Sequence, residues 1–324
     1  MWKIGNIEID GQVVLAPMAG ITNVAYRKFM KPFGVAVSYT EMVSDCGLLY
    51  QNKETYRYLE SCKEDRPLGI QLFGGKKETL LSALKMIENG SYDYDFIDVN
   101  LGCPVPKVTK QEAGSAWLKR PQELYEMMCA LVQASSKPIT AKLRLGWDDA
   151  HINFNEIISL LEKAGVAMIA LHARTRADLY MGKARHSLLK GLKESMHVPL
   201  VISGDVFSLD EAIEIMNITH ADAIMVARGG LGNPYLITQI DHYFKTKEKL
   251  PSPTLQENLE YLEKHYQFLK ELKGEYVAIH ELRGIAPHYL KGYPNMKSFR
   301  VALASKMETE EDFLTILKQA KEYC

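Results

Sequence analysis

The sequence predicts an α/β protein: an eight-stranded parallel barrel, or (β/α)8 barrel, followed by a small all-helical domain. Three observations support this prediction. Eight short runs rich in β-branched and other apolar residues recur along the chain, amphipathic segments separate them, and only helical periodicity follows. Alternating strands and helices favour parallel pairing through helical crossovers. Eight such units over about 240 residues match a (β/α)8 barrel.

The strands are expected at 13–16, 35–39, 69–72, 96–99, 139–143, 168–171, 200–202 and 223–226. Amphipathic segments at 78–88, 121–135, 154–163 and 209–216 are the connecting helices. The structural alternative is a doubly wound sheet, whose first strand is usually followed by a glycine-rich phosphate turn. Here the first strand runs instead into Pro17-Met18-Ala19-Gly20, which lacks that pattern.

A linker is expected near residue 250, because two prolines interrupt the polar segment 249–254. Beyond it, one helical face carries Leu259, Leu262, Tyr266, Leu269 and Leu272. We therefore expect a barrel domain at 1–249 and a helical domain at 250–324.

Composition narrows the class of protein. The 324 residues are 47% hydrophobic, no apolar run is long enough to cross a membrane, and the N-terminus lacks a signal-peptide pattern. The five cysteines are scattered and lack metal-ligand spacing, which indicates a reducing cytoplasm, no disulfide framework and no metal. The net charge of −1 gives no sign of a nucleic-acid partner, so any such contact must come from local patches. Nothing specifies an oligomer, and we expect a monomer.

A single thiol, Cys103, follows the strand 96–99. Gly102 and Pro104 end the strand, so the thiol lies just past its C-terminal end, where barrels of this kind place their chemistry. The basic residues that follow are Lys107, Lys110, Lys119 and Arg120, against Glu112. A thiol in such surroundings is a candidate acid or nucleophile, and the alternative is a small buried core residue.

Polar residues and glycines also follow other predicted strands. They are Gln71, Lys142, Arg144, His172, Arg174, Arg176, Ser203-Gly204-Asp205 and Ala227-Arg228-Gly229-Gly230. Glycines at the last two strand ends let backbone N–H groups approach a phosphate. Each polar residue alone could be structural, such as a satisfied histidine or a paired lysine. Together they predict a site for a polar, electron-rich ring at the barrel mouth.

These motifs resemble one family, the tRNA-dihydrouridine synthases, along the whole chain. The matching segments, in the family's order, are 17–22, 71–74, 98–104, 142–144, 172–176, 203–205 and 227–229. The most similar subgroup is the bacterial B type. The resemblance implies a flavin-dependent TIM barrel with a C-terminal helical RNA-binding domain. It also implies reduction of uridines in the tRNA D-loop by NADPH through FMN, and leaves NADH open as the reductant.

The resemblance assigns roles to individual positions. Cys103 matches the proton-donating cysteine. The FMN contacts match Pro17, Met18 and Ala19 under the ring, Gln71 and Lys142 at its polar edge, His172 beside it, and Ser203, Gly204, Asp205, Ala227 and Arg228 at the phosphate. The departures are Ser203 and Ala227, where the family often has Asn and Gly, and Ala173, where it often has Gly. Contacts made through the backbone would tolerate these changes.

The chemistry of uracil reduction agrees with these residues. The 5,6 double bond takes a hydride at carbon 6, from the flavin, and a proton at carbon 5, from the protein. A thiol with an ordinary pKa of about 8.5 stays protonated at neutral pH yet can release its proton. Asn100 can bond the uracil edge or brace the loop, and Lys142 would stabilise an anionic reduced flavin. The target uridine must be flipped out of its stack to reach the mouth.

Cations suited to RNA concentrate in the tail. Residues 282–307 contain no Asp or Glu. The cations are Arg283, Lys291, Lys297, Arg300 and Lys306, and the rings among them are His288, Tyr289, Tyr293 and Phe299. The expected tRNA contacts are Arg283, Lys291, Lys297 and Arg300, with Arg174 and Arg176 of the barrel. The alternative is that Tyr289 and Phe299 are core residues and the cations are merely solvated.

Two other functions stay open from the sequence. A flavin dehydrogenase of a free pyrimidine, of the dihydroorotate type, would share the barrel but would not need a basic tail. A non-catalytic RNA-binding barrel would need neither the cysteine loop nor the flavin contacts.

Overall fold

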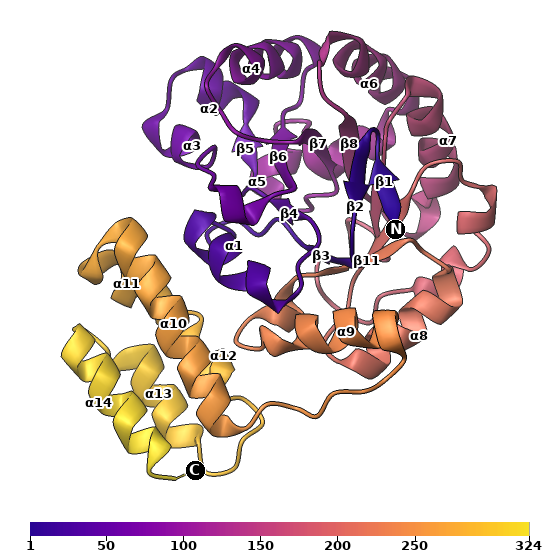
Figure 1. Ribbon diagram of the computed structural model, residues 1–324. Helices are drawn as coiled ribbons and strands as arrows, with labels where there is room; N and C mark the ends of the chain where they lie inside the picture. Colours follow the sequence, from indigo (N-terminus) through magenta and orange to yellow (C-terminus); the bar gives the residue numbers. More distant parts are fainter. Residues whose placement is uncertain (324) are drawn as a thin grey trace. The chain divides into compact units, whose positions relative to one another are not determined.

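The computed structural model describes residues 1–323 and contains a parallel barrel of eight strands (Figure 1). They are β3 (Val13–Leu15), β4 (Ser38–Tyr39), β6 (Leu68–Phe73), β7 (Phe96–Leu101), β8 (Ile139–Arg144), β9 (Ile169–His172), β10 (Leu200–Ser203) and β11 (Ala223–Val226). Their order is β3-β11-β10-β9-β8-β7-β6-β4, and the short β5 (Val43–Ser44) also pairs with β6. The ring closes where the Leu15 N–H donates to the Val37 carbonyl at 2.9 Å. The predicted (β/α)8 fold and its eight strands are confirmed.

The strand register aligns the polar residues that the sequence places in separate segments. The pairs across neighbouring strands are Gln71 with Asp98, Asn100 with Lys142, Arg144 with His172, and His172 with Ser203. All strands of the barrel run in the same direction, so their carboxyl ends meet at one end of it. The candidate site residues of the barrel therefore gather at that end.

Helices flank the barrel (Figure 1) and confirm the four predicted amphipathic segments. They are α4 (Lys77–Asn89), α6 (Pro121–Ala134), α7 (Phe154–Ala164) and α8 (Leu209–Thr219). In α6, Pro121 occupies the first turn, where an N–H needs no helical partner, and Leu124, Met127 and Leu131 are buried at helical spacing. The shorter helices of this part are α2 (Asp45–Leu49), α3 (Lys53–Arg57) and α5 (Pro106–Thr109).

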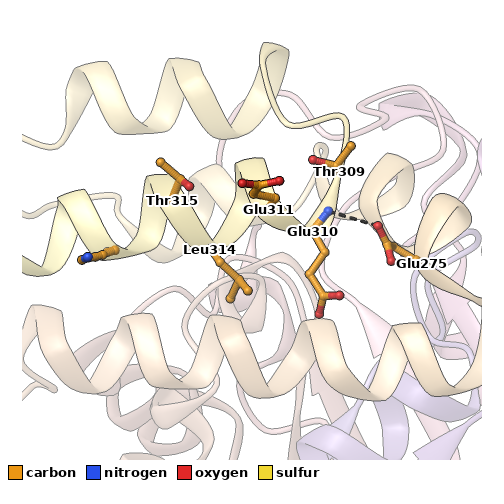
Figure 2. Close-up of a pocket in the computed structure, with 7 residues that line it drawn as sticks. Glu275, Thr309, Glu310, Glu311, Leu314 and Thr315 are labelled. Carbon is orange, nitrogen blue, oxygen red and sulfur yellow. Dashed lines mark hydrogen bonds between the residues drawn. The ribbon is translucent and has the colours of Figure 1, made fainter.

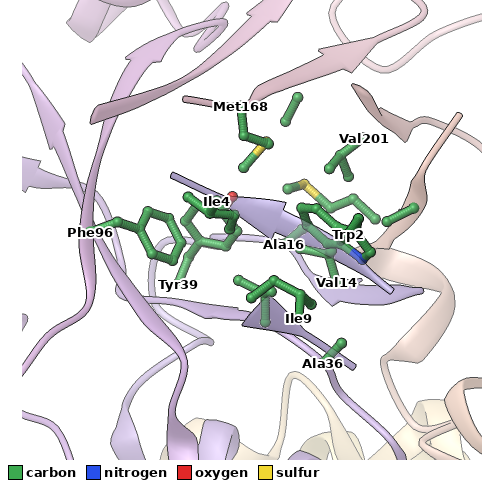
Figure 3. Close-up of a cluster of buried hydrophobic side chains, with 14 residues drawn as sticks. Trp2, Ile4, Ile9, Val14, Ala16, Ala36, Tyr39, Phe96, Met168 and Val201 are labelled. Carbon is green, nitrogen blue, oxygen red and sulfur yellow. The ribbon is translucent and has the colours of Figure 1, made fainter. Parts of the chain in front are cut away.

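The first residues of the chain form an antiparallel hairpin, β1 (Trp2–Ile4) and β2 (Ile7–Ile9), that sequence periodicity does not reveal. Figure 3 shows its apolar side chains packed in one buried cluster with those of the barrel. The cluster comprises Trp2, Ile4, Ile9, Val14, Ala16, Ala36, Val37, Tyr39, Phe96, Met168, Ala170, Val201, Ala223 and Met225. Phe96 and Ala223 are the first residues of β7 and β11, so the hairpin closes the N-terminal end of the barrel, opposite the candidate site.

The chain divides into two compact units. The first comprises residues 1–24 and 35–227, and the second comprises 25–34 and the chain from 228 onward. The helices of the second unit are most of α1 (Val24–Met30), then α9 (Tyr235–Thr246), α10 (Leu255–Lys273), α11 (Glu275–Leu282), α12 (Ala286–Tyr289), α13 (Lys297–Ser305) and α14 (Glu310–Lys321). No strand follows residue 226 in the described chain, which confirms a helical C-terminal region. The domain boundary at residue 250 stays a prediction.

Within the second unit, α10 carries the predicted apolar face. Its buried residues are Asn258, Leu259, Leu262, His265, Tyr266 and Leu269. A reciprocal cap between Thr254 and Glu257 begins the helix. The segment 25–34 contributes to the same core, because the Phe29 ring stacks on His265 with centroids 4.9 Å apart.

The second unit also holds an open pocket of about 560 Å³ beside the start of α14 (Figure 2). Its lining residues are Glu275, Thr309, Glu310, Glu311, Leu314, Thr315 and Lys318. Glu310 is paired with Lys270, and the other two carboxylates, Glu275 and Glu311, outnumber Lys318, so this pocket does not suit a polyanion such as RNA. Among residues 1–323, no helix is long and apolar enough to cross a membrane, and no three His, Cys, Asp or Glu side chains are grouped to hold a metal ion.

Trp2→Ala is expected to lower the free energy of unfolding by about 3–5 kcal/mol, because it leaves a cavity where the hairpin closes the barrel. It also removes the indole N–H that donates to the Gly11 carbonyl at 2.9 Å. Chemical denaturation followed by circular dichroism measures the loss. Lys3→Ala is the control, because this neighbouring side chain is exposed and its ion pair with Glu8 should contribute below about 1 kcal/mol. Equal losses for both variants would contradict the packing role of Trp2.

Candidate active site

The candidate catalytic thiol lies in a closely packed loop directly after β7. Cys103 is 8% exposed, and its apolar neighbours are Val108, Ala113, Met42 and Phe73. Gly114, at φ +59°, packs against this loop, since a Cβ there would lie 2.8 Å from the Cys103 carbonyl oxygen. The Ser115 N–H donates to the same carbonyl at 3.1 Å. The position of the thiol is therefore fixed by the packing of the loop behind it.

Burial raises the pKa of the Cys103 thiol above its ordinary value. A hydrogen bond from the backbone at Val105 and the cations Arg144 and Lys142 oppose this shift, but desolvation is the larger effect. At neutral pH the group is therefore a thiol, which can donate a proton, rather than a thiolate nucleophile. Of the two chemical roles that the sequence leaves open, this environment favours the acid.

A chain of hydrogen bonds connects the cysteine loop to a buried carboxylate. Asp98 Oδ2 accepts from Gln71 Nε2 at 2.7 Å, and Asp98 Oδ1 accepts from Thr140 Oγ1 at 2.6 Å. Gln71 Oε1 accepts from Asn100 Nδ2 at 2.8 Å, and Asn100 Oδ1 accepts from the Cys103 N–H at 2.8 Å. Because an ionised carboxylate only accepts hydrogen bonds, Asp98 sets the orientation of both amides. This series of hydrogen bonds thus positions the Cys103 backbone from within the barrel.

Of the two roles that the sequence leaves open for Asn100, the structure shows the bracing role. Its Oδ1 accepts a second backbone N–H, from Gly102 at 3.1 Å, and its Nδ2 also lies 3.0 Å from the Met42 sulfur. Both ends of the amide are engaged within the protein. Contact of Asn100 with a uracil edge stays a prediction.

Lys142 is a half-buried cation at this end of β8. Burial, reinforced by the nearby Arg144, lowers the pKa of Lys142 to about 8, while Asp98 and Cys103 oppose the shift. The amine is still mostly protonated at pH 7. It forms no hydrogen bond or ion pair within the described residues. Lys142 therefore offers an unneutralised positive charge.

His172, at the end of β9, is neutral. Burial lowers the pKa of its imidazole well below 6.5, and the cations Lys142, Arg144 and Arg174 add to the shift. His172 Nε2 lies 3.3 Å from an Arg174 guanidinium nitrogen, which can only donate, so Nε2 accepts and the proton is assigned to Nδ1. Gly204, at φ +116°, approaches the ring so closely that a Cβ would lie 2.9 Å from His172 Cδ2.

Arg144, one of the polar strand-end residues that the sequence places at the barrel mouth, holds two loops together. Its guanidinium is buried and donates to the carbonyl oxygens of Gly102 at 2.9 Å, Thr175 at 2.7 Å and Leu179 at 2.7 Å. One side chain thereby fixes the cysteine loop to the loop after β9. The signal in the sequence is its place two residues after Lys142, which puts both side chains on one face of the strand.

Arg174 corrects a sequence prediction, because it is not placed to contact tRNA. Its side chain is 1% exposed and donates to both carboxylate oxygens of Asp205, at 2.8 and 2.7 Å. It also donates to the carbonyls of Met181 at 3.1 Å and Gly182 at 2.7 Å. A buried arginine paired in this way positions the loops after β9 and β10. The Asp205 carboxylate is equally engaged, so a phosphate contact at Asp205 would come from its backbone.

The other predicted cofactor contacts lie at the ends of β3, β10 and β11. They are Pro17, Met18 and Ala19, then Ser203 and Gly204, then Ala227 and Arg228, of which Arg228 begins the second unit. In the first of these turns, the Met18 N–H donates to Thr22 Oγ1 at 2.9 Å. Contact of these residues with a cofactor stays a prediction.

The predicted RNA contacts of the tail differ in exposure. Lys291, Lys297 and Arg300 are exposed and form no ion pair with a described residue. Arg283 is half-buried, and its Nε donates to the Met307 carbonyl at 2.7 Å. The three exposed cations are therefore the ones free to bind an anion.

Two aromatic residues of the tail, Tyr289 and Phe299, pack among its helices, as the alternative to RNA stacking expects. Tyr289 is fully buried, with its hydroxyl 3.0 Å from His265 Nδ1. Phe299 is half-buried, and its ring centroid lies 5.4 Å from that of Tyr323. These rings support the helices, whereas the cations beside them face the solvent.

The fold and the strand-end residues define an α/β-barrel protein with a thiol, a cation and a neutral imidazole at the C-terminal ends of its strands, where barrel enzymes place their chemistry. The family model described as dihydrouridine synthase matches residues 14–323. The chain belongs to the dihydrouridine synthase family.

Relatives match over nearly the whole chain. A probable tRNA-dihydrouridine synthase of Rickettsia conorii is 34% identical and covers 99% of each chain. The tRNA-dihydrouridine synthase B of Pseudomonas aeruginosa is 32% identical over 95% of this chain and 92% of its own. Among solved structures, histamine dehydrogenase from Rhizobium sp. 4-9 aligns with a TM-score of 0.54 at 15% identity, over 74% of this chain and 47% of that one. At such low identity the likeness shows the fold alone.

Asp98→Asn is expected to change how stability depends on pH. Burial raises the pKa of Asp98 from 3.8 to about 6, although hydrogen bonds from Thr140 and Gln71 and the charge of Lys142 oppose the shift. Between pH 3.8 and about 6, the folded state therefore binds more protons than the unfolded state. The contribution of Asp98 to the free energy of unfolding should therefore fall as pH rises from about 4 to 6. The variant lacks this titration. The free energy of unfolding of the parent minus that of the variant should therefore fall by up to about 3 kcal/mol across that pH range.

Urea unfolding at pH 4, 5, 6 and 7 measures this difference. Asp10→Asn, which removes an exposed carboxylate, is the control for the loss of one negative charge. A parent-minus-variant difference that stays constant with pH would contradict the raised pKa of Asp98.

Proposed function

We propose that this protein is a tRNA-dihydrouridine synthase that reduces the 5,6 double bond of D-loop uridines, with FMN as cofactor and NADPH as reductant. The observation that carries the proposal is the buried, protonated thiol at the end of β7 in a member of the dihydrouridine synthase family. The names of its relatives support a tRNA substrate. We also propose that it acts in the cytoplasm as a monomer.

The strand ends suit an FMN cofactor. Lys142 carries a positive charge that no described residue neutralises, which fits the negative charge of a reduced flavin. The proposed ring contacts are Pro17, Met18, Ala19, Gln71, Lys142 and His172, and the proposed phosphate contacts are Ser203, Gly204, Asp205, Ala227 and Arg228. When bound, the flavin supplies the hydride that is added at carbon 6 of uracil.

Cys103 is the proposed general acid. Its S–H bond breaks as a C–H bond forms at carbon 5, and the thiolate left behind regains a proton from solvent. Arg144 and Lys142 favour that thiolate electrostatically, which eases proton release from a group that burial keeps neutral beforehand. Asn100 keeps the loop in place, and neutral His172 can donate a hydrogen bond through Nδ1.

The tail is proposed to bind the tRNA backbone. Lys291, Lys297 and Arg300 are exposed cations without carboxylate partners, in a protein whose net charge is only −1. Arg283 lies beside them in sequence, and Arg176 of the barrel joins them as a proposed contact. The target uridine must leave its stack to enter the barrel mouth, at a cost of a few kcal/mol.

Mapping dihydrouridine in tRNA from cells without this protein, and again after its restoration, tests the proposed function and identifies the uridine. The purified protein should be yellow and release FMN on denaturation. Reduction of a free pyrimidine with no effect on tRNA would support the dehydrogenase alternative. A colourless protein that cannot be reconstituted with FMN would contradict the flavin assignment.

Cys103→Ala should slow the formation of dihydrouridine by about 10²–10⁴-fold, because it removes the proton donor. Its flavin spectrum and its reduction by NADPH should stay normal, since neither needs the thiol. Single-turnover assays with tRNA measure the effect. Cys129→Ala, on α6, is the control and should react like the parent. Near-normal tRNA reduction by Cys103→Ala would refute the assignment.

A triple variant of Lys291, Lys297 and Arg300 to alanine should bind tRNA more weakly. Each lost phosphate contact should reduce the slope of log affinity against log salt by about one unit. Flavin content and NADPH oxidation should be unchanged, because they depend on the barrel.

Filter binding across a salt series measures both affinity and slope. Lys85→Ala/Lys163→Ala, on the helices that flank the barrel, is the control for the loss of exposed lysines. If the triple variant bound tRNA like the parent, the tail cations would be only solvated.

A further inference from the structure

Two cations at the C-terminal end of the barrel share one aromatic ring. The Lys119 ammonium lies 4.5 Å and the Arg176 guanidinium carbon 4.4 Å from the centre of the Trp147 ring. Lys119 is in the connection after β7, Trp147 in the connection after β8, and Arg176 in the connection after β9. These strands are neighbours in the sheet, so the three residues lie on adjacent connections at the end that carries Cys103.

The indole holds these cations without neutralising them. Neither side chain forms an ion pair or a side-chain hydrogen bond with a described residue, and Arg176 Nε is buried with no hydrogen-bond partner. A cation–π contact attracts a cation through the ring quadrupole and adds no negative charge. The pair therefore keeps two positive charges available to a ligand.

Three other arginines at this end of the barrel are neutralised by carboxylates, whereas Arg144 gives its donors to carbonyl oxygens. The pairs are Arg185 with Asp149 and Asp178, Arg120 with Glu112 and Glu123, and Arg174 with Asp205. Asp148, which follows Trp147 directly, is engaged by His151 at 2.6 Å. Against this background, two unneutralised cations on one ring indicate a site for an anion.

The backbone fixes the ring and its guanidinium partner. The Arg176 N–H donates to the Gly146 carbonyl and the Ala177 N–H donates to the Trp147 carbonyl, both at 2.9 Å. Gly146 is needed for this fit, since a Cβ there would lie 2.0 Å from the His151 carbonyl oxygen. The site is preorganised, which reduces the entropy lost when an anion binds.

We propose that Lys119 and Arg176, held on Trp147, bind a backbone phosphate of the tRNA strand next to the uridine presented to Cys103. The inference rests on the proposed function and adds a phosphate site on the barrel to the tail contacts. A pyrimidine that reaches Cys103 after β7 brings its own flanking phosphates over the neighbouring connections. The connections after β7 and β9 carry the two cations, and the connection after β8 carries the ring between them. The site would therefore hold the strand on which the chemistry occurs.

Affinity for unmodified tRNA across a salt series tests the site in the full-length, flavin-loaded protein. Lys119→Gln and Arg176→Gln should each weaken binding and reduce the salt slope by about 0.7–0.9 units. Trp147→Leu keeps both charges but removes the ring, and should weaken binding about fivefold, whereas Trp147→Phe should bind within about twofold of the parent. Lys85→Gln is the control for the loss of an exposed lysine. Flavin content and thermal unfolding verify that each variant is folded.

The outcomes separate this site from the proposed function. Normal tRNA binding by folded Lys119→Gln and Arg176→Gln variants of an active parent would overturn the site alone. A raised KM for NADPH with normal tRNA binding would also overturn it, and would assign the cations to the dinucleotide phosphate. A parent that neither binds nor reduces tRNA would contradict the proposed function and this site together.

Discussion

The buried carboxylate of Asp98 determines how the polar residues at the barrel mouth are arranged. It accepts hydrogen bonds from Thr140 and Gln71, and those bonds leave the Gln71 carbonyl facing Asn100. Asn100 then has its own carbonyl free for the backbone of the cysteine loop. If Asp98 were replaced by a group that also donates, both amides could rotate and the loop would lose a defined partner. The arrangement of the cysteine loop thus depends on a charge placed beneath it.

The positive side chains of the barrel fall into two kinds. Arg144 and Arg174 are buried and give their donors to carbonyls or to a carboxylate, so they tie loops together. Lys142, Lys119 and Arg176 keep their charge, because no carboxylate lies within ion-pair distance of them in the described chain. Position in the sequence does not separate the two kinds, since Arg174 and Arg176 are two residues apart. What separates them is whether a partner from another strand end reaches the guanidinium.

The sequence predicts the eight strands, the four main helices and the helical C-terminal region, because each has a run of apolar residues long enough to show its period. The N-terminal hairpin escapes prediction, because each of its strands alternates apolar and charged residues over only three positions and lacks the continuous apolar run that marks a barrel strand. The burial of Arg174 also escapes it, because its partner Asp205 lies on a different strand end. The same reason explains the bracing role of Asn100, which depends on Gln71 of the neighbouring strand. Local patterns predict elements, whereas the pairing of side chains between elements depends on register.

The hairpin has a consequence for how the protein is synthesised. Trp2 packs in a cluster that includes Met225, and β3 pairs with β11, so the first and last strands of the barrel are neighbours. At about 5–20 residues per second, a ribosome needs about 10–45 s to make the intervening chain. During that time the apolar residues of the hairpin have been made, whereas the late members of their cluster, up to Met225, have not. The apolar side of the hairpin therefore stays partly uncovered on the nascent chain, and the N-terminal end of the barrel can close only after residue 226 has left the exit tunnel.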